Sequence, residues 1–248
     1  VRHCLCTLQA LFEKKKEIVT SDMLHIENEY IDFKREPLLH RKYSNEGPAA
    51  CSGDVNGDGL DDIFIGGSTG FEGKVFIQNE NGSFKKLSNP DIETDKVYED
   101  TDATFADVDN DKDLDLMVVS GGSEFPNQSP NYQSRLYIND GKGNFTRADL
   151  PWELQEAPSF AFTSYGKPGK FLAAGNFFGT IPYEGRYDAL QPTCFSFDGK
   201  SKQFLVDFKV NAFDGEARDA KWLNTSGGNK LLLIARNNNG IKFYKKAN

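Results

Sequence analysis

Two acidic loops that repeat along the chain constrain its fold more than any other feature. The segment DVNGDGLDDIFIGG (54–67) aligns with DVDNDKDLDLMVVSGG (107–122), so Asp107 repeats Asp54 at an offset of 53 residues. In both copies the acidic loop runs into apolar, strand-forming residues and then into two glycines. Self-similarity on this scale is typical of folds that stack one small structural unit per repeat.

The second halves of the two repeats also align. GKVFIQNENGSFKKL (73–87) matches SRLYINDGKGNFTRADL (134–150) at an offset of 61 residues, and the difference is absorbed by the loop SEFPNQSPNYQ before the second copy. Each repeat is therefore expected to contain, in order, an acidic loop, an apolar strand, a Gly-Gly turn, a strand of alternating apolar and polar residues, a turn of Asn and Gly, and a short strand bearing Phe. That order describes one small antiparallel sheet.

Two fainter copies follow without the acidic residues. GKFLAAGNFFG (169–179) and PTCFSFDGKSKQFLVD (192–207) form the third, and EARDAKWLNTSGGNKLLLIARNNNGIKFYKK (216–246) forms the fourth. The sequence thus predicts an all-β fold, a β-propeller-like array of four-stranded antiparallel blades with about four units. Three alternatives explain the small number of units: a fragment, a shortened natural form, or a four-unit array that the lead-in closes. A β-sandwich with two similar hairpins is the alternative.

The predicted organisation is a lead-in over 1–46, in which 5–19 can be written as a short amphipathic helix, followed by a propeller domain over 47–248. Its units are expected at about 47–98, 99–156, 157–210 and 211–248. The 20 Phe against 2 Met and 2 Trp agree with aromatic-rich sheet and argue against disorder.

The acidic loops place oxygen donors at a fixed spacing. Side-chain oxygens stand at positions 1, 3, 5 and 9 of each loop, with a backbone carbonyl available at position 7, and Ca²⁺ prefers six to eight such hard oxygen ligands. Position 12, where an EF-hand needs Glu, is Ile65 in one loop and Val118 in the other. Two calcium sites are predicted, with the ligands Asp54, Asn56, Asp58, Leu60 (carbonyl) and Asp62, and Asp107, Asp109, Asp111, Asp113 (carbonyl) and Asp115.

One position departs from this pattern, because Lys112 stands where the first loop has Gly59. If the loop requires a positive φ there, Lys costs on the order of 1 kcal/mol more than Gly. The second loop has four side-chain carboxylates against three, so its charge favours the ion. We therefore expect both loops to bind, the second at least as tightly.

These loops resemble the calcium loops of FG-GAP repeats, also called VCBS repeats, which are the blade units of integrin α-subunit-type β-propellers. The lead-in HIENEYIDFKREPLLHRKYSNEGPA and the tail from GRYDALQPTCFSFDGK to LLLIARNNNGIKFYK further resemble bacterial FG-GAP repeat proteins related to the cartilage acidic protein group. The resemblance implies a calcium-binding, non-catalytic adhesion module at the cell surface or outside the cell that binds a protein or a glycan. A propeller-fold enzyme, or an accessory domain acting on surface glycans, is the alternative.

Composition excludes several function classes. The net charge of −8 disfavours a nucleic-acid partner, and no run of residues approaches the length of a membrane span. Nucleophile and zinc motifs are absent, so no enzyme is expected. The three histidines, His3, His25 and His40, all lie in the lead-in and are expected at the surface. The four cysteines lack zinc-site spacing, and their disulfide state is left open.

Aromatic residues on loops are the candidate contact surface for a partner. They are Phe125 and Tyr132 in one loop, and Phe177, Phe178, Tyr183 and Tyr187 in another. Core packing is an equally good interpretation for the pair Phe177 and Phe178.

Overall fold

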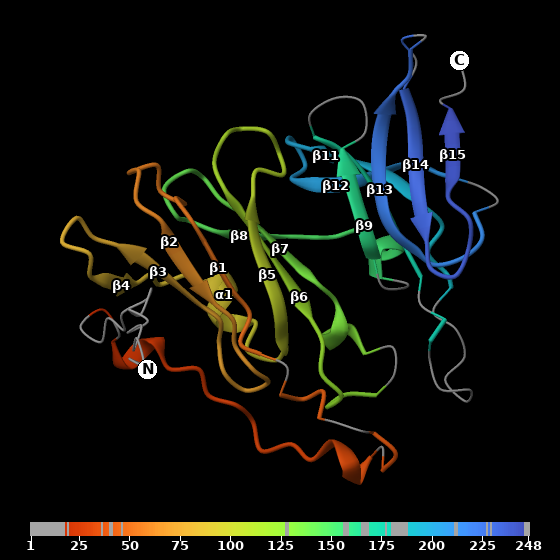
Figure 1. Cartoon of the computed structure of the whole chain (residues 1–248). Coiled ribbons are helices and arrows are strands. Elements are labelled where there is room, and N and C mark those ends of the chain that lie inside the picture. The colour runs from red at the N-terminus through yellow and green to blue at the C-terminus, as the bar shows by residue number, and fades with distance from the viewer. Residues whose placement is uncertain are drawn as a thin grey trace, which may run out of the picture.

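The computed structural model contains four antiparallel sheets joined in chain order (Figure 1). It describes residues 18, 20–35, 37–39, 42–45, 47–126, 129–155, 159–164, 169–176, 178–179, 188–210, 213–226, 228 and 230–245. The helix expected over 5–19 lies outside these residues except for residue 18, as do Cys4 and Cys6.

Every sheet is a meander in which consecutive strands are hydrogen-bonded neighbours. Sheet 1 comprises β1 (Ala50–Gly53), β2 (Asp62–Ile65), β3 (Lys74–Gln78) and β4 (Phe84–Lys86), and sheet 2 comprises β5 (Asp100–Ala106), β6 (Asp115–Ser120), β7 (Arg135–Ile138) and β8 (Thr146–Ala148). Sheet 3 comprises β9 (Ser159–Ser164), β10 (Lys170–Gly175), β11 (Thr193–Asp198) and β12 (Gln203–Lys209), and sheet 4 comprises β13 (Ala217–Asn224), β14 (Lys230–Arg236) and β15 (Lys242–Lys245). Among the described residues sheet 4 has three strands, where four were expected for each blade.

Among the residues that the structure describes, helical structure is confined to short turns. These are the 3₁₀ turns η1 (Ser21–Met23), η2 (Asp32–Lys34), η3 (Pro130–Tyr132) and η4 (Trp152–Gln155), and one helix, α1 (Pro90–Thr94). The helix was not predicted, although its start signals are in the sequence. The Asn89 side chain accepts the N–H of Ile92, Pro90 stands at the first helical turn, and Glu93 accepts the N–H of Asn89.

Three apolar clusters hold the sheets face to face in the order 1, 2, 3, 4. Phe64 and Val75 of sheet 1 pack with Leu116 and Val118 of sheet 2 in the first cluster. The second joins sheets 2 and 3, and the third joins sheets 3 and 4. Each fully buried Phe or Leu contributes about 1.5 to 3 kcal/mol through removal of apolar surface from water. Packing of neighbouring sheets is therefore the main source of stability in the array.

The array is open rather than ring-shaped. The first strands of neighbouring sheets lie together at the contacts of β1 with β5 and of β9 with β13, as expected when sheets fan out from their first strands. The sheets do not close into a circle (Figure 1). The expected all-β, propeller-like class is confirmed, and none of the described helices is long and apolar enough to span a membrane.

The described part of the lead-in runs along one end of sheets 1 and 2, coloured red to orange in Figure 1. Ser68 donates a hydrogen bond to the carbonyl of Ile26 (2.7 Å), and a ring nitrogen of His25 lies 3.0 Å from the carbonyl of Gly66. Asp32, which is buried, accepts the N–H groups of Tyr43 and Ser44 within the lead-in at 3.0 Å and also accepts the hydroxyl of Ser123, in the connection between β6 and β7. The lead-in is thus attached to the sheets by hydrogen bonds from several of its residues.

Candidate metal centre

The two acidic loops occupy equivalent places in sheets 1 and 2. Each connects the first strand of its sheet to the second, β1 to β2 and β5 to β6. Each loop ends on a fully buried aspartate, Asp62 or Asp115, that is also the first residue of the second strand. The repeat seen in the sequence is therefore also a repeat in space.

Asp62 and Asp115 fix the corner between loop and sheet in the same way. Asp62 accepts the N–H of Val55 (3.1 Å) on one oxygen and the N–H of Gln78 (2.9 Å) on the other. Asp115 accepts the equivalent N–H groups, those of Val108 (2.9 Å) and Asn139 (2.9 Å). The position-9 carboxylate thus ties the start of its loop to the third strand of the sheet, a structural role that adds to its predicted role as a ligand.

The position-1 aspartates curl the loops by accepting backbone N–H groups from further along. Asp54 accepts from Gly57 (2.7 Å) and from Gly59 (2.8 Å), and Asp107 accepts from Asn110 (2.6 Å) and Lys112 (3.2 Å). The curl places positions 4 and 6 at positive φ in both loops. The four angles are 76° at Gly57, 86° at Gly59, 65° at Asn110 and 83° at Lys112. Position 6 therefore requires a left-handed backbone, so the strain expected for Lys112 at a positive φ applies.

Positions 3 and 5 continue the same pattern of short-range bonds. Asn56 accepts the N–H of Asp58 (2.9 Å), and Asp109 accepts that of Asp111 (3.2 Å). A carboxylate or amide oxygen that accepts one N–H still has a free lone pair, so these contacts leave both oxygens able to bind a cation.

The second loop gathers five carboxylates. Side-chain oxygens of Asp107, Asp109 and Asp115 lie within 4.8 Å of one another, and so do those of Asp109, Asp111 and Asp113. The sequence assigned only the carbonyl of Asp113 to the site, whereas the structure also places its side chain beside the others, with one oxygen buried and unpartnered. An all-oxygen donor set of this kind fits a hard cation such as Ca²⁺.

Crowding of like charges shows in the pKa values of this loop. Burial raises the pKa of Asp113 to about 7, and the neighbouring Asp111 carboxyl adds to the shift. Burial likewise raises the pKa of Asp115 to about 6, although the N–H groups of Asn139 and Val108 act in the opposite direction. A bound cation would relieve this repulsion, because an opposite charge favours the ionised form.

The first loop is less acidic at its centre. Asn56 replaces the aspartate of position 3, and its amide donates to Asp58 at 2.9 Å. Burial raises the pKa of Asp62, and the charges of Asp58 and Asp54 contribute to the shift. Among the described residues, the carboxylates of Asp54, Asp58 and Asp62 do not come as close together as those of the second loop, and the first loop has one negative charge fewer at the same positions.

Asn139 is a site residue that the sequence interpretation missed. Its buried amide donates to the carbonyls of Val55 in the first loop (2.7 Å) and Leu114 in the second (3.0 Å). Its side-chain oxygen accepts the N–H groups of Asp140 (2.9 Å) and Gly143 (3.1 Å). The only sequence signal was its place at the end of an alternating strand, where the first repeat has Gln78. Asn139 joins the two loops to each other.

The aromatic residues predicted as a contact surface lie outside the acidic loops. Phe125 and Tyr132 are partly buried against each other, with ring centroids 6.0 Å apart, and the Tyr132 hydroxyl donates to the Phe125 carbonyl (2.7 Å). The pair packs within its own loop and keeps part of its surface exposed, so its role as a contact surface stays a prediction. Phe178 is partly buried, and Phe177, Tyr183 and Tyr187 lie outside the described residues.

His25, which was expected at the surface, is only partly exposed. Its side chain is 12% exposed, and its second ring nitrogen lies 2.8 Å from the Glu27 carboxylate. His3 and His40 lie outside the described residues. The two described cysteines, Cys51 and Cys194, are free thiols.

Comparison with known families confirms the resemblance to FG-GAP repeats for the part of the chain that contains the two acidic loops. Residues 54–118 match the model of an FG-GAP-like repeat, a span that begins at the first residue of one loop and includes the whole of the other. No curated protein sequence matches the chain.

Solved structures that resemble the chain include two described as "Structure of Dos1 propeller" and "Crystal structure of BBS1N in complex with ARL6DN, soaked with lead". The first has 10% identity and a TM-score of 0.37 and covers 75% of this chain and 42% of its own. The second has 9% identity and a TM-score of 0.32 and covers 79% of this chain and 50% of its own. This chain therefore spans half or less of the length of either structure.

Proposed function

We propose that this chain is a non-catalytic interaction module in which calcium ions bound to the two acidic loops stabilise the first two sheets. The observation that carries the proposal is the oxygen cluster of the second loop, where five carboxylates lie together in a fold that repeats in the first loop. Without a cation these groups repel one another, so binding is coupled to the stability of the loop. The ions have a structural role in this proposal.

The proposed ligands are those that the spacing predicted. They are Asp54, Asn56, Asp58, the Leu60 carbonyl and Asp62 in the first loop, and Asp107, Asp109, Asp111, Asp113 and Asp115 in the second. The similarity of residues 54–118 to an FG-GAP-like repeat supports a place outside the cell or at its surface.

Calorimetry and thermal melting test the calcium sites. Asp58→Ala and Asp111→Ala should each remove one of two loop-bound ions and reduce the rise in melting temperature that calcium produces. Asp61→Asn is the matched control, because Asp61 is exposed and lies between ligand positions 7 and 9 of the first loop. Unchanged calcium stoichiometry in both alanine variants would refute the proposal.

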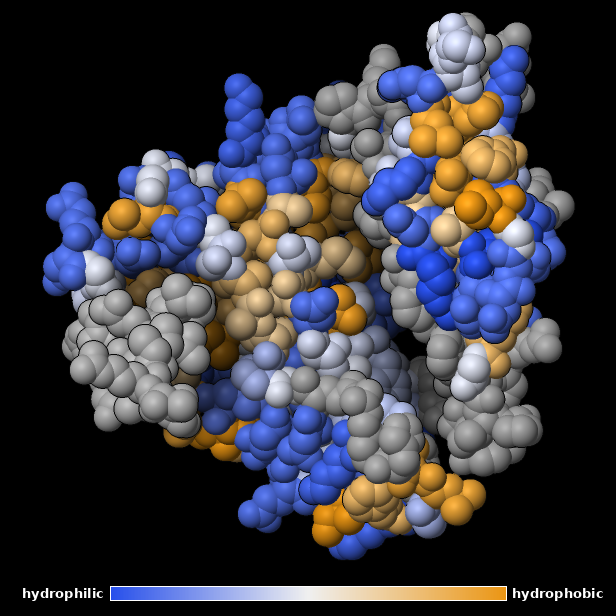
Figure 2. Space-filling view, viewed as in Figure 1, coloured by the Kyte–Doolittle hydropathy of each residue, from blue (hydrophilic) through white to orange (hydrophobic). Residues whose placement is uncertain are grey.

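The partner is proposed to be a protein or a glycan. Exposed apolar side chains support an interaction surface at the sheet-4 end of the array, where Leu223 is 40%, Ile241 55% and Phe243 57% exposed. Figure 2 shows hydrophobic side chains gathered over β13–β15 among hydrophilic ones. Binding to an array of glycans and surface proteins that is lost in Phe243→Ser, with the fold intact, would support this surface, whereas unchanged binding would place the contact elsewhere.

A further inference from the structure

A cavity of about 250 Å³ lies between the lead-in and sheet 1. Residues 24–26 of the lead-in form one wall, and the connection from β2 to β3 forms much of the other. Ser68 of that connection donates to the Ile26 carbonyl, and a ring nitrogen of His25 contacts the Gly66 carbonyl, so hydrogen bonds join the two walls. The volume is below the range of about 300 to 1,000 Å³ that is typical of pockets for drug-sized ligands, so the cavity suits a small molecule.

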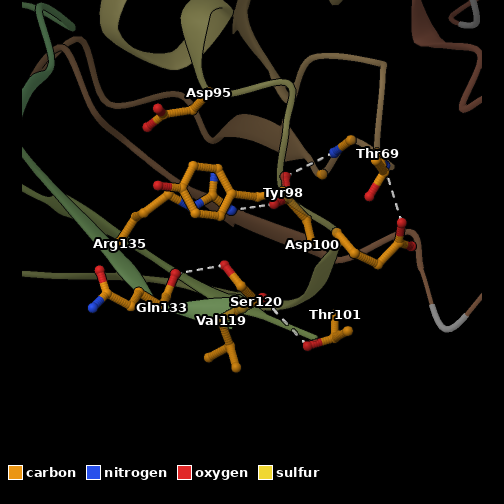
Figure 3. A network of polar contacts seen from close by, with 12 residues as sticks. Thr69, Asp95, Tyr98, Asp100, Thr101, Val119, Ser120, Gln133 and Arg135 are labelled. Atoms are coloured by element: carbon orange, nitrogen blue, oxygen red, sulfur yellow. Dashed lines mark hydrogen bonds and ion pairs between the residues drawn. The ribbon is translucent and has the colours of Figure 1, made fainter. Parts of the chain in front are cut away.

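Gly67 gives the second wall its shape. A Cβ atom there would be 2.2 Å from the Phe71 carbonyl oxygen, so only glycine lets the connection fold back this closely. The Gly67 N–H is also donated to the buried carboxylate of Asp100 (2.8 Å), which forms an ion pair with Arg135. Figure 3 shows Asp100 and Arg135 with the ring of Tyr98, which lies over the guanidinium at 4.2 Å. The wall is therefore fixed to sheet 2 before any ligand binds.

Large apolar side chains of both walls are exposed at the cavity. Leu24 is 63%, Ile26 44% and Phe71 40% exposed, and all three line the same space. A single exposed apolar residue is ordinary, whereas several that share one hollow are typical of a ligand site. Covering them would remove apolar surface from water, which favours a ligand with an apolar body.

Basic side chains outnumber acidic ones in the lining. His25, Lys74 and Lys96 line the cavity, and Glu72 is the one acidic residue among the described lining residues. The Glu72 carboxylate already forms an ion pair with the ammonium of Lys86, which lies outside the lining. The chain as a whole has a net charge of −8, so this local excess of positive charge runs against the overall balance. It favours an anionic ligand.

The two lysines carry this excess, because His25 contacts the Glu27 carboxylate. Lys74 donates to the backbone carbonyls of Asp22 (3.0 Å) and Leu24 (3.3 Å). Among the residues that the structure describes, no carboxylate forms an ion pair with Lys74 or Lys96. An ammonium group has three donors, so Lys74 retains one for a bound anion.

We propose that this cavity binds a small organic carboxylate with an apolar body. The ammonium groups of Lys74 and Lys96 hold the carboxylate, and the exposed apolar side chains of the two walls cover the rest of the molecule. Because the ligand contacts both walls, its binding also holds the lead-in against sheet 1. None of the predicted calcium ligands lines the cavity, so the site does not depend on the acidic loops.

Isothermal titration calorimetry of the full chain with 3-phenylpropanoate tests the site. We expect saturable binding of one molecule per chain. The amide 3-phenylpropanamide keeps the apolar body without the charge, and acetate keeps the charge without the apolar body, so each should bind at least about tenfold more weakly. If 3-phenylpropanoate does not bind, or if the amide binds equally well, the proposal is overturned.

Substitutions of single lysines show whether the charges act as proposed. Lys74→Met and Lys96→Met should each lower the affinity for 3-phenylpropanoate at least about fivefold and leave the affinity for the amide unchanged. Lys85→Met, which changes an exposed lysine of β4 outside the lining, is the matched control and should alter neither affinity. If the lysine variants weaken the carboxylate and the amide equally, or weaken neither, the assigned role of the charges is overturned. Lys96→Met leaves the hydrogen bonds from Lys74 to the lead-in intact, and circular dichroism checks the fold of every variant.

Discussion

Asn139 joins the two acidic loops, so its removal tests how strongly sheets 1 and 2 depend on each other. The substitution Asn139→Ala deletes four side-chain hydrogen bonds but keeps the backbone N–H that Asp115 accepts. Because Asn139 is 2% exposed, water cannot replace the lost partners without disturbing the packing. The predicted ligand carboxylates are untouched.

The expected cost follows from which partners remain buried. The bonds to the Val55 carbonyl and the Gly143 N–H are buried, and each orphaned buried group costs about 1 to 3 kcal/mol. The bonds to Leu114 and Asp140 are partly exposed and add less than about 1 kcal/mol together. We expect a loss of about 3 to 5 kcal/mol in the free energy of unfolding, or roughly 10 °C in melting temperature.

Gln78→Ala is the matched control, since Gln78 occupies the equivalent position of the first repeat. Its side chain makes a single exposed hydrogen bond, to the Asp61 carbonyl (2.8 Å), so its loss should cost less than about 0.5 kcal/mol. Urea unfolding in chelator, followed by circular dichroism, measures both variants without any contribution from bound calcium. If the two differ by less than about 1 kcal/mol, Asn139 does not couple the loops as argued.

Three further predictions concern backbone strain, pH and charge. Lys112→Gly should raise the free energy of unfolding by about 0.5 to 1 kcal/mol, because glycine adopts the positive φ of this position without strain. Gly59→Ala should lower the free energy of unfolding by about 1 kcal/mol for the converse reason. Changes of the opposite sign in urea unfolding would contradict the strain argument. Burial raises the pKa of Asp32, but hydrogen bonds from Ser123, Ser44 and the backbone outweigh it and lower the pKa to about 2. The stabilisation from Asp32 should therefore be present above about pH 4 and lost as the pH falls toward about 2. Asp32→Asn should flatten the dependence of stability on pH in that window, and an unchanged profile would exclude a stabilising role for the Asp32 carboxylate. Arg135→Met should lower the free energy of unfolding by about 3 to 5 kcal/mol, because it removes the partner of the buried Asp100 carboxylate. The added substitution Asp100→Asn should recover part of that loss. A double variant no more stable than Arg135→Met would show that the unpaired charge is not the cause.

The repeated segments were predictable because local signals and global packing agree in them. The apolar runs after Asp62 and Asp115 became β2 and β6, and the glycines and Asn110 stand where the loops need positive φ. Each of these features is encoded within about ten residues, which is the range over which periodicity and turn chemistry act.

Features that depend on distant partners were not predictable in this way. The first strand of sheet 1, Ala50–Gly53, is short and contains no β-branched or aromatic residue, so only its pairing with β2 identifies it. Asn139 acquires its role from the first loop, where its partner Val55 lies 84 residues away in the chain. The partial burial of His25 has the same origin, because the Gly66 carbonyl that its ring contacts lies 41 residues away in the chain.

The bond from Asn139 to the first loop also bears on how such an array could evolve. Repeats of this kind are thought of as interchangeable parts, each gained by duplication and lost by deletion. Here the carbonyl of Val55 in one repeat is satisfied by a side chain of the next, while the equivalent Gln78 side chain bonds within its own repeat. An insertion between the two would separate these groups, so the smallest exchangeable part of this half of the molecule is a pair of repeats.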